Sequence, residues 1–152
     1  MEFKSIHEVL QFALSKEEAS VQFYRELAGR MQNPASRRLA ESLAQQETSH
    51  VQMIALEMNK QGFCVRANEQ LEDKEFIWDE HLQLDDEARN MNPVEIMAMA
   101  IQKERAAFQL YAQLLGLAHD IQFRTMLMDL AEEEVRHILL LEQQYEILIH
   151  EK

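Results

Sequence analysis

Apolar residues recur every three or four positions along four segments of the chain, the spacing that places them on one face of an α-helix. Each segment opens with Ser, Asn or Asp, which cap helices well, and two segments then have proline at the first helical position. The predicted helices run from Ser5 to about Met31, from Asn33-Pro34 to Gly62, from Asn92-Pro93 to near Gly116, and from near Asp120 onward. The pattern therefore predicts an all-α protein that folds as a four-helix bundle.

Residues 63–92 interrupt this pattern. The segment is acidic and lacks a helical period, although it holds Phe63, Phe76 and Trp78, which we expect to pack against the side of the bundle. We interpret it as a long crossover between the second and third helices, because simple up-and-down bundles use short loops instead. With 152 residues the chain has the size of one domain, so we expect residues 1–152 to form a single domain.

The two halves of the sequence repeat each other at a shift of 87 positions. Each half therefore forms one helical hairpin, and two hairpins close the bundle. The polar residues that recur unchanged are candidates for chemistry: Glu17, Tyr24, Glu47 and His50 in the first half match Glu104, Tyr111, Glu134 and His137 in the second. In both halves the two glutamates are thirty residues apart.

These glutamates and histidines lie on the apolar faces of the predicted helices. Glu47 and His50, for example, share the face that Leu43 and Ile54 define. Carboxylates gathered in a core need compensation, because burying even one unpaired ion costs several kcal/mol. Two divalent cations would cancel the four negative charges, and two neutral imidazoles would complete the coordination. Such a ligand set suits iron or manganese better than zinc.

The arrangement is that of the ferritin-like di-iron carboxylate proteins, in which two helices each supply a Glu and two each supply Glu-x-x-His. More narrowly, the sequence resembles the rubrerythrin group through Glu17-x6-Tyr24, Leu-Ala-x2-Glu47-x2-His50, Glu104-x6-Tyr111 and Leu-Ala-x2-Glu134-x2-His137. The resemblance implies two iron ions, with manganese or a mixed pair as alternatives. The implied bridging ligands are Glu47 and Glu134, the implied terminal ligands are Glu17 and Glu104, and the imidazoles implied to bind one metal each are those of His50 and His137.

Two features depart from the rubrerythrin pattern. Rubrerythrins carry a rubredoxin domain whose iron is held by four cysteines, whereas this sequence has the single cysteine Cys64, for which we expect an inert thiol. The electron donor is then expected to be a separate protein, such as a rubredoxin. Rubrerythrins also have an additional Glu one turn after the third-helix ligand, and here that position holds Ala107, which matches Ser20 of the first half. The predicted site is therefore more symmetric than that of rubrerythrin.

The other polar residues have supporting roles or none in this interpretation. Tyr24 and Tyr111 face inward, and we expect each phenol to donate a hydrogen bond that orients a ligand carboxylate. The alternative for both is an ordinary core tyrosine. We expect surface positions for several residues that lie off the repeat or off the apolar face: His7, His81, His119, His150, Glu132 and Glu133.

Reduction of hydrogen peroxide, or of dioxygen, is the activity we expect, because two neighbouring ferrous ions can deliver two electrons together. Two alternatives stay open at this point. One is a ferroxidase that stores or delivers iron, which needs an enclosing oligomer or a partner. The other is a bundle that binds metal without turnover.

Net charge and hydropathy narrow the range of partners. The formal net charge of −12 argues against nucleic acid and membrane surfaces, because an acidic surface repels phosphate backbones and anionic lipid. No apolar run reaches the ~20 residues that a membrane span needs. We therefore expect a cytoplasmic protein, and the family resemblance favours a homodimer.

Overall fold

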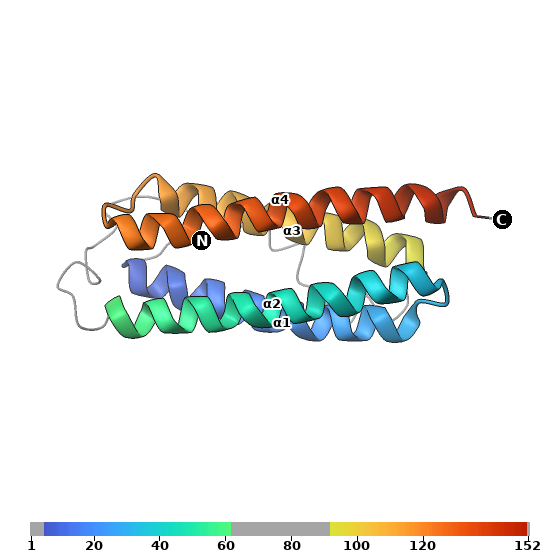
Figure 1. Ribbon diagram of the computed structural model, residues 1–152, viewed down its shortest axis with the longest axis horizontal. Coiled ribbons are helices and arrows are strands. Elements are labelled where there is room, and N and C mark those ends of the chain that lie inside the picture. The colour runs from blue at the N-terminus through green and yellow to red at the C-terminus, as the bar shows by residue number, and fades with distance from the viewer. Residues whose placement is uncertain (1–4, 62–91, 152) are drawn as a thin grey trace.

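The computed structural model describes residues 5–61 and 92–151 of the chain. Four helices make up this part of the molecule, and all of them run along its long axis (Figure 1). Their bounds are α1 Ile6–Arg30, α2 Pro34–Gln61, α3 Pro93–Leu115 and α4 Ile121–Ile149. The most extensive contacts pair α1 with α2 and α3 with α4, while α2–α4 and α1–α3 contacts join the two hairpins. The predicted four-helix bundle of two hairpins is confirmed; the predicted crossover, except for Asn92, lies outside the described residues.

The helices begin where their cap residues stand in the sequence. In each case the cap side chain accepts a hydrogen bond from a backbone amide of the first turn, which would otherwise lack a partner. The bonds run to Ser5 Oγ from Glu8 N (3.2 Å), to Asn33 Oδ1 from Ser36 N (3.1 Å), to Asn92 Oδ1 from Glu95 N (2.9 Å) and to Asp120 Oδ2 from Phe123 N (2.9 Å). All four predicted starts are confirmed.

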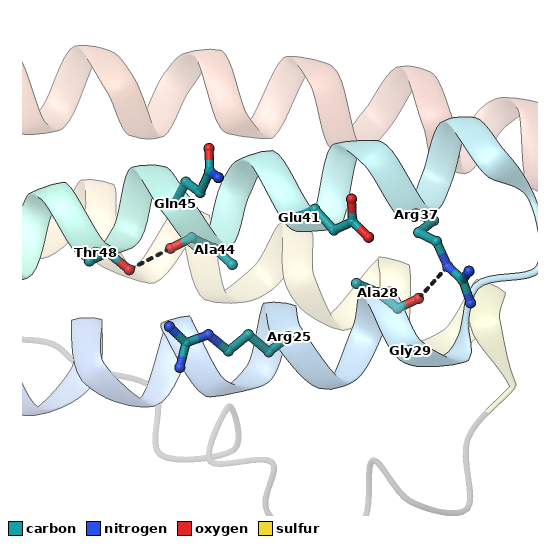
Figure 2. Close-up of a pocket in the computed structure, with 8 residues that line it drawn as sticks. All are labelled: Arg25, Ala28, Gly29, Arg37, Glu41, Ala44, Gln45 and Thr48. Atoms are coloured by element: carbon teal, nitrogen blue, oxygen red, sulfur yellow. Dashed lines mark hydrogen bonds between the residues drawn. The ribbon is translucent and has the colours of Figure 1, made fainter.

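Two arginines at equivalent positions of the repeat fasten the turns of the hairpins. Arg37 Nε donates to Ala28 O near the end of α1 at 3.2 Å, a bond that crosses the groove between α1 and α2 (Figure 2). Arg124 Nη1 donates to Leu115 O at 2.7 Å and to Ala118 O at 2.9 Å after α3. Each guanidinium thus donates to a carbonyl group in the last turn of the preceding helix, where helical hydrogen bonds end.

The apolar core divides into two clusters at opposite ends of the bundle. One gathers the start of α1 and α4 with the ends of α2 and α3, around Leu10, Leu114 and Phe123. The other gathers the remaining halves of the same helices, around Leu27 and Met97. A group of buried polar side chains lies in the middle of the bundle, between the two clusters. Within the described residues, no helix is both long and apolar enough to cross a membrane.

Candidate metal centre

All four helices contribute to a buried polar centre between the two apolar clusters. None of its six residues is more than 3% exposed. α1 supplies Glu17, α2 supplies Glu47 and His50, α3 supplies Glu104, and α4 supplies Glu134 and His137. These are the six residues predicted from the sequence, and the structure brings all of them together.

The six side chains form two overlapping groups, each able to hold a metal ion. Within each group, one ligand atom per residue lies within 4.8 Å of the others. The first group is Glu17, Glu47, His50 and Glu134, and the second is Glu47, Glu104, Glu134 and His137. Only the two glutamates of α2 and α4 belong to both groups. A pair of metal positions that share two carboxylates is the geometry of a bridged dimetal site.

The shared glutamates point one oxygen toward each imidazole. Glu47 Oε2 lies 3.2 Å from His50 Nδ1, and Glu47 Oε1 lies 3.3 Å from His137 Nδ1. Glu134 Oε1 lies 3.3 Å from His50 Nδ1, and Glu134 Oε2 lies 3.7 Å from His137 Nδ1. Each carboxylate therefore serves both groups at once, as a bridging ligand must.

Each of the other two glutamates lies close to one imidazole only. Glu17 Oε2 lies 3.6 Å from His50 Nδ1, and Glu104 Oε2 lies 3.5 Å from His137 Nδ1. The two imidazole rings face each other nearly parallel, with 5.7 Å between their centroids. The centre thus has an approximate two-fold symmetry that follows from the sequence repeat.

The inward tyrosines hold the terminal glutamates, and they do so across the bundle. Tyr24 on α1 donates its hydroxyl to Glu104 on α3, and Tyr111 on α3 donates to Glu17 on α1. Burial and the neighbouring carboxylates raise the pKa of both phenols, so each remains a donor. Each tyrosine therefore donates to a glutamate of the centre, while the role of those glutamates as metal ligands stays a prediction. Each bond also ties one hairpin to the other.

Several atoms at the middle of the centre have no hydrogen-bond partner among the described residues. They are Glu47 Oε2, both carboxylate oxygens of Glu134, and Nδ1 of His50 and His137. Buried polar atoms are nearly always paired, because an unmet one costs about 1–3 kcal/mol. These five atoms all face the shared interior of the two groups. Divalent cations there would satisfy every one of them, so the residues fit a dimetal site.

The outer nitrogen of each imidazole has a partner that the sequence interpretation missed. His50 Nε2 contacts Glu133 Oε2, and His137 Nε2 lies 2.6 Å from Gln46 Oε1. Because both partners accept, Nε2 carries the proton and Nδ1 keeps its lone pair for a metal. The expectation that Glu133 is only a solvated surface residue was therefore wrong, whereas Glu132 is exposed as expected.

Without metal, the carboxylates hold protons on the imidazoles. Burial alone would lower the pKa of His50, but the nearby carboxylates of Glu17 and Glu47 raise it to about 11. The same balance, with Glu104 and Glu47, raises the pKa of His137 to about 9. Burial and the charges of Glu17 and Glu104 also raise the pKa of Glu47. Protons therefore supply part of the positive charge that metal ions would supply.

Metal binding is consequently expected to release about one proton from each imidazole at pH 7, since both imidazole pKa values lie above 7. For each proton released, affinity falls about tenfold when the pH is lowered by one unit. Calorimetric titration with a divalent metal, repeated in buffers of different ionisation enthalpy, measures the number of protons. Binding without proton release would contradict the raised pKa values.

The other histidines lie outside the site, as the sequence predicted, where the structure describes them. His119 and His150 are exposed and His7 is half-buried, and no metal-binding group among the described residues includes them. Ala107 packs against the apolar cluster around Leu10. Cys64 and His81 lie outside the described residues.

Comparison with known families gives one match that spans most of the chain. Residues 8–145 match the family model described as Rubrerythrin, a range that contains all six residues of the centre. No curated protein matches the sequence significantly.

Solved structures match over almost the whole chain at low sequence identity. A protein from Thermotoga maritima that is described as a ferritin-like diiron-carboxylate protein has a TM-score of 0.82 at 18% identity. The match covers 96% of this chain and 98% of that protein. A hypothetical protein from Pyrococcus furiosus has a TM-score of 0.74 at 19% identity, with coverages of 95% and 90%. A two-domain protein from Anabaena variabilis, with DJ-1/ThiJ/PfpI-like and ferritin-like domains, has a TM-score of 0.71 at 11% identity; the match covers 97% of this chain and 37% of that protein. These likenesses confirm the fold.

Proposed function

The chain belongs to the rubrerythrin family, and from that premise we propose that it is a di-iron oxidoreductase that reduces hydrogen peroxide to water. The observation that carries the proposal is the pair of shared glutamates, Glu47 and Glu134, each with one oxygen toward each imidazole. Bridging carboxylates hold two metal ions close enough to act on one small molecule together. A reaction that needs two electrons at once suits such a centre.

Iron is the metal that the proposal assigns to the centre, on family grounds. Four carboxylates balance two divalent ions, and the two imidazole Nδ1 atoms add one neutral ligand to each. Carboxylate and imidazole donors suit iron or manganese, whereas structural zinc favours compact tetrahedral sites rich in sulfur and nitrogen. When bound, two ferrous ions supply the two electrons that, with two protons, convert one hydrogen peroxide into two waters.

The protein's own contribution is to hold the ligands and limit access of water. The hydroxyl groups of Tyr24 and Tyr111 fix the terminal carboxylates, and the partners at Nε2 fix both imidazole rings. The apolar clusters on either side exclude water from the middle of the bundle, which strengthens electrostatic interactions there. Ala107 leaves no additional carboxylate at the position where rubrerythrins have one, so the proposal assigns both metal ions to these six ligands.

We also propose an external electron donor of the rubredoxin type and a homodimer, both on family grounds. The sequence has one cysteine, which cannot by itself build the four-cysteine iron site of a rubredoxin. Reduction of the oxidised protein by a purified rubredoxin, followed optically, tests the first proposal. Light scattering on the purified protein tests the second.

The proposed activity predicts that the anaerobic diferrous protein reacts rapidly with hydrogen peroxide in a stopped-flow mixer, consuming about one peroxide per pair of iron ions. The reaction with peroxide is expected to be faster than the reaction with dioxygen. Absence of fast oxidation by peroxide would refute the proposal. Faster oxidation by dioxygen, together with retention of more than two iron ions per chain, would indicate a ferroxidase that stores iron instead.

A further inference from the structure

The side chain that precedes each shared glutamate contacts the imidazole of the opposite hairpin. Gln46 precedes Glu47 on α2 and reaches His137 on α4; Glu133, at the equivalent position of the repeat, reaches His50 on α2. The amide of Gln46 has a fixed orientation, because its Nε2 donates to Ser42 Oγ at 3.0 Å and leaves Oε1 to accept from His137. One imidazole therefore donates to a neutral amide and the other to a carboxylate.

We propose that this difference makes the two metal positions unequal. The position beside Glu17 and His50 binds a divalent ion more tightly than the position beside Glu104 and His137, and Glu133 is the positioning residue responsible. The proposal rests on the dimetal site alone. It does not depend on the reaction with peroxide.

The physical reason is the charge of the acceptor at Nε2. A hydrogen bond to an ionised group is roughly twice as strong as one to a neutral group, and it makes the imidazole a better electron donor to the metal. The carboxylate of Glu133 also adds one negative charge to the side of His50. Arg136 Nη2 lies 3.7 Å from Glu133 Oε1, but its side chain is 64% exposed, so solvent screens this ion pair.

The rest of the centre is closely matched between its two halves. Each terminal glutamate accepts from a tyrosine, and each lies 3.5 or 3.6 Å from its imidazole. Both shared glutamates serve both positions. At the imidazoles the two halves differ in chemistry, because His137 contacts an amide oxygen and His50 contacts a carboxylate.

Stepwise binding of cobalt(II), measured by calorimetry on the metal-free protein, tests the proposal. Glu133→Gln is expected to weaken the tighter step by about 10–100-fold, the usual effect of mutating the partner of a ligand imidazole. Gln46→Glu is expected to strengthen the weaker step by a similar factor. Glu132→Gln and Gln45→Glu are the matched controls, since each makes the same change of charge at an exposed neighbour, and both should leave the steps nearly unchanged.

Crystals grown with less than one cobalt(II) per chain show which position fills first. Anomalous scattering is expected to be stronger beside His50 in the original protein and stronger beside His137 in the double variant Gln46→Glu/Glu133→Gln. The double variant keeps composition and net charge, and its melting temperature shows whether the fold is preserved. Equal filling of the two positions, or filling that the exchange does not reverse, would overturn the proposal. A failure of peroxide reduction would leave it untouched.

Discussion

Replacing Glu134 with alanine is expected to leave the protein unable to retain either of its two metal ions. This single side chain belongs to both metal-binding groups, and both of its oxygens are buried without a hydrogen-bond partner among the described residues. Its loss removes one ligand from each position and one of the four negative charges that balance the two cations. A terminal ligand acts differently: Glu17→Ala removes a ligand from only one group, so that variant should keep one ion.

Metal content after dialysis against metal-free buffer measures this difference. We expect two ions per chain in the original protein, about one in Glu17→Ala and fewer than one in Glu134→Ala. Each metal position needs its full set of ligands, and Glu17 belongs to one set whereas Glu134 belongs to both. Glu57→Gln is the control, because Glu57 is a buried glutamate of α2 that belongs to neither group. If Glu134→Ala kept two ions, the shared-ligand geometry would be wrong.

Local rules of helix formation account for how closely the fold follows from the sequence. Asn92 and Asp120 each stand where helical periodicity begins, and in the structure each caps a helix through its own side chain. Proline after Asn33 and Asn92 marks the first helical position for the same local reason. Such signals act within one turn, so the helix bounds could be predicted without knowledge of the tertiary structure.

The residues of the site could be predicted because the Glu-x-x-His motif, weak evidence on its own, occurs in both halves of the repeat. One Glu-x-x-His on a helix is a common surface pair, but two copies, each preceded by a glutamate on an apolar stripe, require a shared buried centre. The structure brings those six residues together, while their roles as metal ligands stay a prediction. Which glutamate accepts from Tyr24 and which from Tyr111 could not be predicted, since that depends on which helices lie opposite one another.

Glu133 and Gln46 were missed for a geometric reason. A residue next to an inward-facing ligand projects to the side of the helix, where periodicity predicts solvent. Their long side chains nevertheless reach the neighbouring helix and contact the outer nitrogen of an imidazole there. The available signal was the coincidence of two long polar side chains at one repeat position, each directly before a candidate bridging glutamate.

The second large effect concerns stability, because metal ions neutralise charges that the fold buries. A free metal concentration 100-fold above the dissociation constant stabilises a one-site protein by about 2.7 kcal/mol, so two sites give about 5 kcal/mol. For a domain of this size each kcal/mol moves the melting temperature by about 2–4 °C. Removal of metal with a chelator is therefore expected to lower the melting temperature by about 10–20 °C.

Glu47→Gln is expected to be at least as stable as the original protein without metal, but less stable than it with metal. In the metal-free protein, burial and the charges of Glu17 and Glu104 raise the pKa of Glu47 above its ordinary 4.5, although the nearby His137 lowers it. The folded state therefore favours the protonated carboxyl, and stability from this group is lost as the pH rises from 4.5 toward the raised pKa. A neutral amide escapes that loss, but it is a poor ligand for a divalent ion.

At pH 7, thermal unfolding of metal-free samples should show Glu47→Gln melting at or above the original protein, with the difference vanishing in acid, where both side chains are neutral. With metal present, the original protein should melt about 10–20 °C higher than the variant, since only it gains the full linkage stabilisation. Glu57→Gln again supplies the control for loss of a buried carboxyl group outside the centre. A variant less stable than the original protein under both conditions would mean that Glu47 stabilises the folded state even without metal. Metal ions would then not stabilise the protein by neutralising its buried charge.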